Sequence, residues 1–308
     1  MYNIDKKYPK VYIVILSWNN YEDTKECLES LRNISYPNYK VVVVDNGSKD
    51  DSTKKNQQEF PEHIYIYIKE NSGFSGGNNP AIEYSLKAGA DYVLMLNNDT
   101  TVEPDFLDFL VKGFNEDKNI GITAPKMNYY YQPKMIWVAG GKISKIRGCG
   151  VAFGNKAKDE EKKYNVDKFI TYVSGCCILV KKEVFEKIGL WDELYYSYAD
   201  DFDFCQKTIN AGFKILYVAK SKIYHKIAVT NKKENPLSVT YYSARNRLYF
   251  SKKLLGGWFY VSVFYFFAVH IPKFLIWLIR GKINEILATI DGANDFFNNR
   301  MGRNRKYY

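Results

Sequence analysis

The sequence predicts an α/β fold in which a mixed, mostly parallel sheet is flanked by helices and followed by an apolar helical extension. Three observations support this: short apolar runs rich in β-branched residues, amphipathic stretches that alternate with them, and a last quarter nearly free of charge. Apolar runs of about four to eight residues separated by helices are typical of βαβ units. The 308 residues are 46% hydrophobic and 25% charged, so they can bury a sizeable core.

The elements are expected in a regular order. Strands are predicted at residues 11–17, 40–45, 64–69 and 91–96, and helices at 20–32, 50–60 and 77–88. Residues 126–168 are less regular and are expected to form strands and loops that could cover a site. Further on we expect a buried run at 173–180, helices at 182–188 and 200–211, and a strand-like segment at 214–218. The predicted domains are residues 1–235 and a helical extension, 236–308.

Polar residues follow each of the four N-terminal strands. These clusters are residues 17–19, 45–48, 71–79 and 97–100. Parallel sheets bind ligands at the carboxyl ends of their strands, so we expect the four clusters to meet at one edge and form a binding site.

Asp99 is a candidate metal ligand. It follows a predicted strand and the amides Asn97 and Asn98, and such oxygen atoms suit Mg²⁺ or Mn²⁺ shared with substrate phosphates. A loop aspartate that caps the next helix is an equal alternative. His225, one of three histidines, is either a metal or phosphate ligand or a partly exposed polar residue.

Asp200, Asp201 and Asp203 place three acids within four residues. Like charges this close raise one another's pKa, which can tune a general base. The more common alternative is a solvated helix start, where acids complement the dipole. The glycine-rich stretch 71–79 either lets backbone N–H groups approach phosphate or is a plain strand-to-helix loop. It matches neither a dinucleotide fingerprint nor a Walker A loop.

The composition narrows the function further. The net charge of +10, from 44 basic and 34 acidic residues, favours acidic partners such as anionic lipid or phosphorylated substrates. Basic residues do not interleave with aromatic ones in a nucleic-acid stripe, so no nucleic acid is expected as a partner. The five cysteines lack zinc spacing, and no G-x-S-x-G motif occurs. The odd cysteine count and a polar N-terminus without a signal peptide indicate a reducing, cytoplasmic compartment.

Seven motifs, taken in order, resemble those of the family 2 glycosyltransferases with the GT-A fold, and most closely the rhamnosyltransferase-like branch. The resemblance extends over residues 11–225, and more loosely to Arg247. The motifs are V-I-L-S-W-N-N, V-V-D-N-G-S-K-D-D-S, N-S-G-F-S-G-G-N-N, L-N-N-D-T, S-G-C-C-I-L-V-K-K-E-V-F-E-K-I-G-L-W-D-E, Y-A-D-D-F-D-F-C and Y-Y-S-A-R-N.

The resemblance implies a role for each matching residue. The donor nucleotide would lie against Ser17, Asn19, Asp45, Asn46, Gly47, Gly73, Gly76, Asn78, Asn79 and Asn98. Asp99 would bind the metal, with His225 near the metal or diphosphate. Asp201 matches the catalytic base, and Trp191 and Asp192 match the acceptor-side segment.

Two positions depart from the family pattern. Asn97 replaces the first acid of the D-x-D motif, which weakens the expected metal site. The acidic pair is Asp200-Asp201 rather than Glu-Asp, so either carboxylate could be the base, with Asp201 preferred by register.

The implied function is inverting transfer of a sugar from a UDP- or dTDP-sugar to an acceptor hydroxyl, assisted by Mn²⁺ or Mg²⁺. The resemblance makes dTDP-rhamnose a candidate donor and a lipid-linked glycan of surface polysaccharide synthesis a candidate acceptor. One alternative, a sugar-phosphate nucleotidyltransferase, would need a G-x-G-x-R loop after the first strand, where S-W-N-N stands instead. Another is a membrane-associated scaffold without activity, against which the retention of Asp45, Asp99 and Asp201 argues.

Residues 254–272 are nearly free of charge, residues 274–279 continue the apolar run, and basic residues flank both. The run is long enough to span a membrane. Gly256-Gly257, His270, Pro272 and Lys273 interrupt it, however, so two short helices lying in the membrane surface, or a buried or dimerisation helix, are alternatives. We favour membrane contact, which predicts a protein that is peripheral or anchored at the inner face of the cell membrane. The basic tail, residues 298–308, is expected to be disordered.

Overall fold

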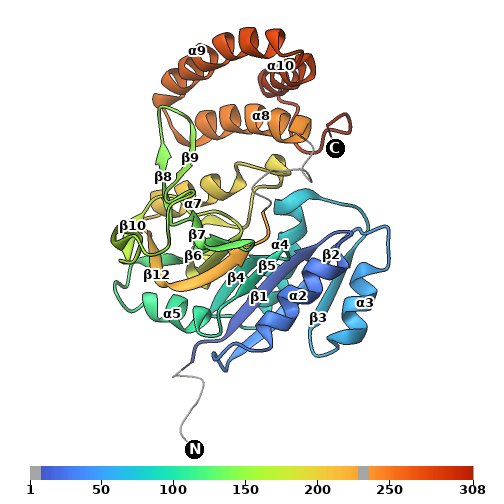
Figure 1. Ribbon diagram of the computed structural model, residues 1–308, viewed down its shortest axis with the longest axis vertical. Coiled ribbons are helices and arrows are strands. Elements are labelled where there is room, and N and C mark those ends of the chain that lie inside the picture. The colour runs from blue at the N-terminus through green and yellow to red at the C-terminus, as the bar shows by residue number, and fades with distance from the viewer. Residues whose placement is uncertain (1–7, 228–235, 308) are drawn as a thin grey trace, which may run out of the picture.

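Four parallel strands form from the four predicted apolar runs in this computed structural model, which describes residues 8–227 and 236–307 (Figure 1). They are β1 (Val11–Ser17), β2 (Tyr39–Asn46), β3 (Ile64–Ile68) and β4 (Tyr92–Asn97), in the spatial order β3-β2-β1-β4. Most of the polar N-terminus, residues 1–7, lies outside the described residues. So does the end of the first predicted domain, residues 228–235.

Helices cover both faces of these strands, which explains why each strand is a continuous apolar run. Alternate residues of β1 enter two separate cores. One core lies against α2 (Tyr21–Leu31) and α5 (Phe106–Gly113), and the other against α4 (Gly73–Lys87), α6 (Lys182–Ile188) and α7 (Asp200–Asn210). The short helix α3 (Ser52–Glu59) joins β2 to β3.

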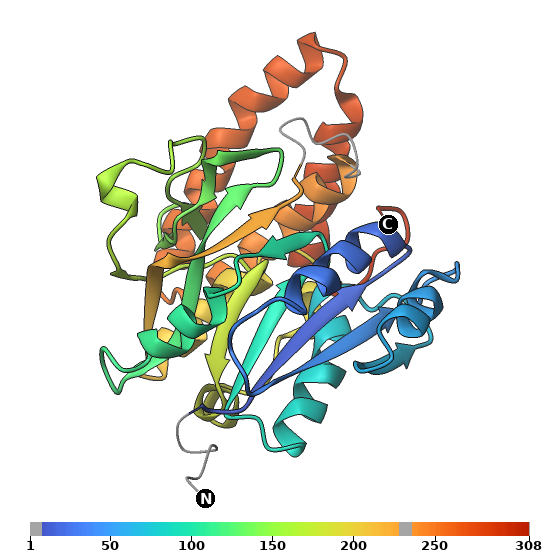
Figure 2. The ribbon, with the colours of Figure 1, turned by 60° about the horizontal axis from the view of Figure 1, so that its bottom comes forward.

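The other half of the sheet is mixed (Figure 2). The strand β11 (Cys177–Lys181) runs antiparallel between β4 and β6 (Ile120–Tyr129), and β12 (Lys214–His225) is parallel to β6. Three further strands border them: β5 (Thr100–Val102), β7 (Gln132–Val138) and β10 (Lys168–Ile170). The predicted α/β class is therefore confirmed, and β12 extends well beyond the expected segment 214–218.

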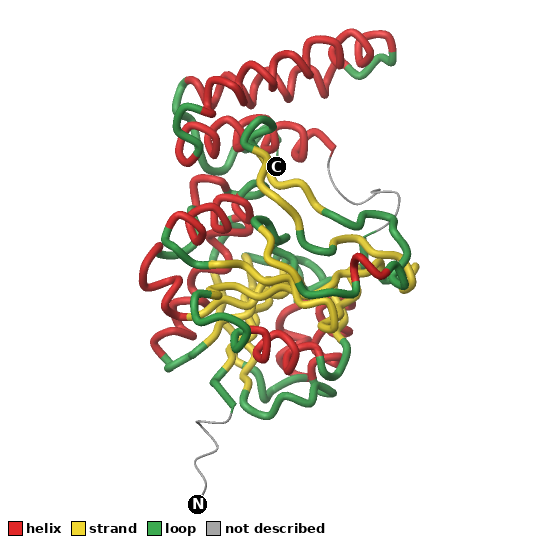
Figure 3. Tube along the Cα trace, turned by 90° about the vertical axis from the view of Figure 1, so that its left-hand side faces the viewer, coloured by secondary structure: helices red, strands yellow, loops and turns green. Residues whose placement is uncertain are grey.

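A separate hairpin, β8 (Gly141–Ser144) and β9 (Cys149–Ala152), rises from the sheet toward the C-terminal helices (Figure 3). Gly148 in its turn has φ 60°, and a Cβ there would lie 2.2 Å from the Ser251 Oγ. The turn therefore fits closely against the first C-terminal helix. The 3₁₀ turn η1 (Lys162–Tyr164) follows this hairpin, and η2 (Glu193–Tyr195) lies between α6 and α7.

Three C-terminal helices, α8 (Pro236–Leu254), α9 (Trp258–Ile279) and α10 (Ile283–Phe297), form a layer beyond the carboxyl edge of the sheet (Figures 1 and 3). The expected break at Gly256-Gly257 separates α8 from α9. The expected break near Pro272 was wrong, because this proline lies inside one helix of 22 residues. A proline removes a single backbone donor, and the rest of the helix retains its own hydrogen bonds.

The expected disorder of the tail was also wrong for residues 298–307. The Tyr307 ring stacks on Tyr241 at a centroid distance of 4.4 Å, and its hydroxyl donates to Asp291. The Asn304 amide donates to the Tyr241 hydroxyl and to Asp295. The prediction rested on charge alone and did not account for the aromatic and polar partners that α8 and α10 present.

Candidate active site

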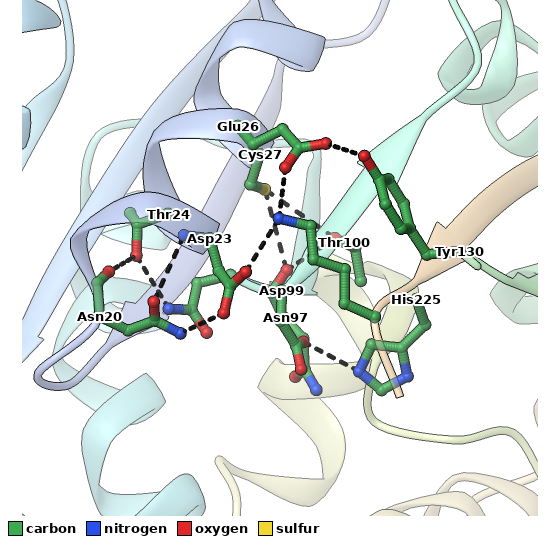
Figure 4. A network of polar contacts seen from close by, with 12 residues as sticks. Asn20, Asp23, Thr24, Glu26, Cys27, Asn97, Asp99, Thr100, Tyr130 and His225 are labelled. Carbon is green, nitrogen blue, oxygen red and sulfur yellow. Dashed lines mark hydrogen bonds and ion pairs between the residues drawn. The ribbon is translucent and has the colours of Figure 1, made fainter. Parts of the chain in front are cut away.

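Asp99 and His225 meet because β5 pairs with β12. The pairing sets Thr100 opposite His225, and Asp99 is the residue just before β5. The His225 Nε2 lies 2.9 Å from the Asp99 Oδ1 (Figure 4), and the Trp137 ring covers the imidazole at 4.6 Å between centroids. The His225 Nδ1 is buried and has no hydrogen-bond partner within residues 8–227 and 236–307.

This pair could hold a divalent cation. A carboxylate oxygen suits Mg²⁺ or Mn²⁺, and such ions usually take their remaining ligands from water and substrate phosphates. No group of three or more histidine, cysteine or acidic side chains is placed to bind a metal in the described part of the chain. A cation here would therefore depend on the substrate to complete its coordination, in keeping with Asn97 at the first position of the D-x-D motif.

A second network holds the Asp99 turn against α2 (Figure 4). The Lys226 backbone N–H donates to the Asp99 carbonyl, and its ammonium group lies 2.9 Å from Asp23 and 2.5 Å from Glu26. The Tyr130 hydroxyl also donates to Glu26. No sequence motif marks this network, because its members come from four separate segments of the chain.

The acidic pair lies at the start of α7, after a strained turn. Tyr198 and Ala199 have φ of 64° and 73°, a left-handed conformation that non-glycine residues rarely adopt and that clusters at functional sites. The Asp200 side chain is 5% exposed and accepts a 2.9 Å hydrogen bond from the Ser75 hydroxyl. Asp201 is more exposed and accepts bonds from the Tyr172 hydroxyl, at 2.9 Å, and its neighbour's backbone N–H.

Both carboxyl groups have a raised pKa. Burial is the main cause for each, and the adjacent Asp201 charge raises the pKa of Asp200 further. The hydrogen bond from Tyr172 acts in the opposite direction on Asp201 by stabilising its charged form. A raised pKa makes each carboxylate a stronger base than an ordinary aspartate, which suits the pair to proton transfer.

Arg245 and Asn246 of α8 fix the segment that leads to the acidic pair. The Asn246 amide donates to the carbonyls of Tyr195, Ser197 and Tyr198 at 2.8–2.9 Å. Arg245 is 1% exposed, and its guanidinium also bonds the Tyr195 carbonyl, at 3.1 Å. These two residues end the motif Y-Y-S-A-R-N, so the structure gives that motif a positioning role.

Two cavities adjoin at the carboxyl edge of the sheet, and they share Phe74, Ser197 and Tyr198. The larger, about 410 Å³, is lined by both carboxylates of the acidic pair and by His225. The smaller, about 320 Å³, is lined by Asn46, Gly73 and Asn98 among others. The predicted meeting of the strand ends at one edge is therefore what the structure shows.

Other predicted donor residues bind one another around the smaller cavity. The Ser17 hydroxyl bonds Thr24, which in turn accepts from the Asn98 amide. Asn19 accepts the Lys49 backbone N–H and donates its own to Ser48. Asp45 accepts the Ser48 N–H, and Gly47 has φ 71° with a backbone too close for a Cβ.

The glycines of the stretch 71–79 mainly allow close packing of the backbone. A Cβ on Gly73 would lie 2.0 Å from the Tyr196 carbonyl, and the first two N–H groups of α4 are bonded to Asn71 and Tyr196. Gly76 faces Ser72, and the Asn78 amide bonds a carbonyl of its own helix.

Asn79, Trp191 and Asp192 also line neither cavity. Asn79 exchanges hydrogen bonds with the Trp191 backbone, and Asp192 bonds Tyr249 and Lys253 of α8. A role for these three residues toward donor or acceptor remains a prediction.

Sequence reasoning did not single out Tyr172, Trp137 or Arg247, although all three line the larger cavity. Trp137 lies in the irregular region 126–168 and Tyr172 lies just beyond it, and no periodic pattern marks either residue. Arg247 directly follows the last recognised motif, which was the one available signal.

The mixed sheet, with the candidate site at its carboxyl edge, defines the fold class of the GT-A glycosyltransferases. A mannosyltransferase from Pyrobaculum calidifontis, solved with GDP-Man and Mn²⁺, superposes with a TM-score of 0.59 at 14% identity over 95% of this chain and 88% of that one. Residues 12–189 match the model of glycosyl transferase family 2, so the chain belongs to that family of inverting glycosyltransferases. This excludes the nucleotidyltransferase alternative.

Two curated relatives span most of the chain. The low-salt glycan biosynthesis hexosyltransferase Agl10 of Haloferax volcanii is 24% identical over 94% of this chain and 92% of its own length. The dTDP-rhamnosyl transferase RfbF of Shigella flexneri is 26% identical over 78% of this chain and 76% of its own. The predicted resemblance to the rhamnosyltransferase-like branch is thus confirmed.

Proposed function

We propose that this enzyme transfers a sugar from a UDP- or dTDP-linked donor to a hydroxyl of a lipid-linked glycan at the cytoplasmic face of a membrane. One observation carries the proposal: His225, bonded to Asp99, and the two carboxylates of the acidic pair line the same cavity, beside a second cavity of donor-type residues.

The donor nucleotide would occupy the smaller cavity, with Asp45 reading the pyrimidine base. The Shigella relative is described as a dTDP-rhamnosyl transferase, which supports dTDP-rhamnose as a candidate donor. Asp99 and His225 would hold Mn²⁺ or Mg²⁺, which neutralises charge on the departing diphosphate.

Asp201 is the proposed base because it is the more exposed carboxylate of the pair and Tyr172 orients it. It takes the proton of the acceptor hydroxyl as that oxygen attacks the anomeric carbon and the bond to the diphosphate breaks. Attack from the face opposite the leaving group inverts the anomeric configuration. A positioned base of this kind contributes about 10²–10⁴-fold to the rate.

Residues 236–308 would hold the enzyme against the membrane, while residues 1–235 would supply the acidic pair, Asp99 and His225. Large apolar side chains on α9 are exposed, with Tyr260 and Phe264 each at 76%. Contiguous exposed apolar side chains of this kind mark interaction surfaces. Arg280 and Lys282 flank the helix, as expected for contact with anionic lipid. One face of α9 buries Ser262, Phe266 and His270, and Phe266 packs on α8 and α10, which favours an in-plane helix over a spanning one.

A donor screen tests the proposal. Full-length protein is incubated with UDP- and dTDP-sugars plus Mn²⁺ or Mg²⁺, and release of the nucleoside diphosphate is measured. Slow release from one donor, abolished by EDTA, is the expected result. Absence of both release and a thermal shift with every UDP- and dTDP-sugar would contradict it and favour the scaffold alternative.

A further inference from the structure

Arg247 of α8 is a cation in the larger cavity, and it forms no ion pair with the residues that the structure describes. It lines the cavity together with both carboxylates of the acidic pair. Its Nε is buried and makes no hydrogen bond, and its Nη2 donates only to the Arg147 carbonyl, among the residues that the structure describes. A buried donor on a charged group is costly unless something accepts its hydrogen bond.

The arginine two residues earlier shows what a structural arginine looks like in this helix. Arg245 donates from all three of its nitrogen atoms, to the Asn246 side chain and to backbone carbonyls that include those of Gly302 and Tyr195. Arg247 does not have such a set of hydrogen bonds within residues 8–227 and 236–307. Because it lies at the cavity wall, a bound ligand can accept a hydrogen bond from its Nε.

The surroundings of Arg247 are also basic. Lys273 of α9 has a lowered pKa because it is partly buried and because the Arg247 charge is near. Arg147, in the turn between β8 and β9, adds a third cation, since its charge and that of Arg247 both act on the thiol of Cys149, whose pKa burial raises. None of these three side chains forms an ion pair within residues 8–227 and 236–307. Cations that are gathered without forming ion pairs of their own favour the binding of an anion.

The apolar helix α9 packs directly beside this basic group through the buried Phe266. The Arg247 guanidinium carbon lies 5.9 Å from the centre of the Phe266 ring on α9. The opposite face of the same helix carries the exposed apolar side chains, among them Phe264 and Ile271. Arg247 thus lies between apolar helix and acidic pair, the order in which a lipid-linked glycan presents lipid, phosphate and sugar.

We propose that Arg247 binds a phosphate or diphosphate group of the acceptor, with Arg147 and Lys273 adding positive charge. The inference rests on the proposed function, because it assumes a lipid-linked acceptor. Guanidinium is suited to this task, since its planar fork can donate two hydrogen bonds to phosphate oxygens.

The test uses farnesyl diphosphate as a short-chain probe in calorimetric titrations of the full chain, with UDP and Mg²⁺ saturating so that the donor diphosphate site is filled. We expect wild-type protein to bind the probe and Arg247→Gln to weaken its binding about tenfold or more. Arg247→Lys should recover part of the loss. Lys252→Gln, an exposed change on the same helix, should bind as wild type does.

Three results would overturn the assignment. The first is that Arg247→Gln binds the probe as tightly as wild type. The second is that saturating UDP abolishes binding of the probe, which would place the probe in the donor site. The third is that inorganic pyrophosphate binds as tightly as the probe, which would indicate a site for a free anion. Farnesol should not bind detectably. The donor screen needs no acceptor, so its failure and the failure of this titration are separate results.

Discussion

Asp99 and His225 are 126 positions apart, yet they approach to 2.9 Å because two short strand segments pair. From the sequence, Asp99 could be recognised as the last acid of a degenerate D-x-D motif. His225 could be matched only by resemblance, since its contact with Asp99 depends on the full length of β12. The networks around them, through Lys226 and Trp137, had no sequence signal at all.

If these two residues hold the cation, His225→Ala should raise the Mn²⁺ concentration needed for half-maximal activity. Loss of a group that supports a metal site typically lowers affinity by about 10–100-fold. Activity is measured against Mn²⁺ concentration, with the melting temperature as a check on folding. His63→Ala, a histidine that stacks on Phe60 far from the cavities, is the matched control. An unchanged Mn²⁺ requirement in His225→Ala would remove this residue from the metal site.

The buried Asp200 carboxyl group should lower the free energy of unfolding at alkaline pH, where it is ionised. Its folded-state pKa is raised above the usual 3.8, so the folded state prefers the protonated form and loses stability as pH rises through the raised value. Asp200→Asn removes that effect. We expect the variant to melt about 2 °C or more above wild type at pH 8, with a smaller difference at pH 5. The exposed Asp51→Asn should show no such gain, and a lower melting temperature for Asp200→Asn at pH 8 would refute the account.

At the scale of elements, the sequence predicted the strands that are buried on both faces, because only continuous apolar runs fit there. The strand β6 escaped prediction because its sequence contains Pro125 and Lys126. Lys126 is 2% exposed in the structure, and partners from distant loops, Asp159 and Asn165, satisfy its charge. Such long-range pairing leaves no local pattern. The order of the tail likewise depends on partners supplied by α8 and α10.

The link between α8 and the segment before the acidic pair makes a kinetic prediction. Asn246→Ala leaves the carbonyls of Tyr195, Ser197 and Tyr198 without this donor, which should lower the free energy of unfolding by about 1–3 kcal/mol. Displacement of the acidic pair should also lower kcat about tenfold or more, with little change in the donor KM. Urea titration and steady-state kinetics measure both. Asn284→Ala, exposed at the start of α10, should alter neither, and a normal kcat in Asn246→Ala would disprove the positioning role.

At the scale of the whole molecule, the two cavities lie between the carboxyl edge of the sheet and the layer of C-terminal helices. The helix α9 lies on the outer side of that layer (Figure 1), and large apolar side chains on it are exposed. Composition alone could indicate an apolar extension. How it packs could not be predicted, because a spanning, an in-plane and a buried helix share one sequence pattern.

Membrane binding should depend on the outer face of α9. Phe264→Glu combined with Leu275→Glu should abolish flotation with vesicles of phosphatidylcholine and phosphatidylglycerol, because both side chains would carry charge into the lipid. Raised salt should weaken wild-type binding in part. The control pair Val166→Glu and Phe169→Glu changes exposed apolar residues near β10 and should float normally. Normal flotation of the α9 variant would rule out this face as the membrane contact.

The measurement that tests the central claim most directly is the turnover of Asp201→Asn beside Asp200→Asn, with the donor found in the screen. We predict that Asp201→Asn lowers kcat by about 10²–10⁴-fold, while calorimetry gives an affinity for the nucleoside diphosphate within about twofold of wild type. Asp200→Asn should retain more activity. Turnover within about tenfold of wild type in Asp201→Asn, together with a larger loss in Asp200→Asn, would contradict the account and move the base to Asp200.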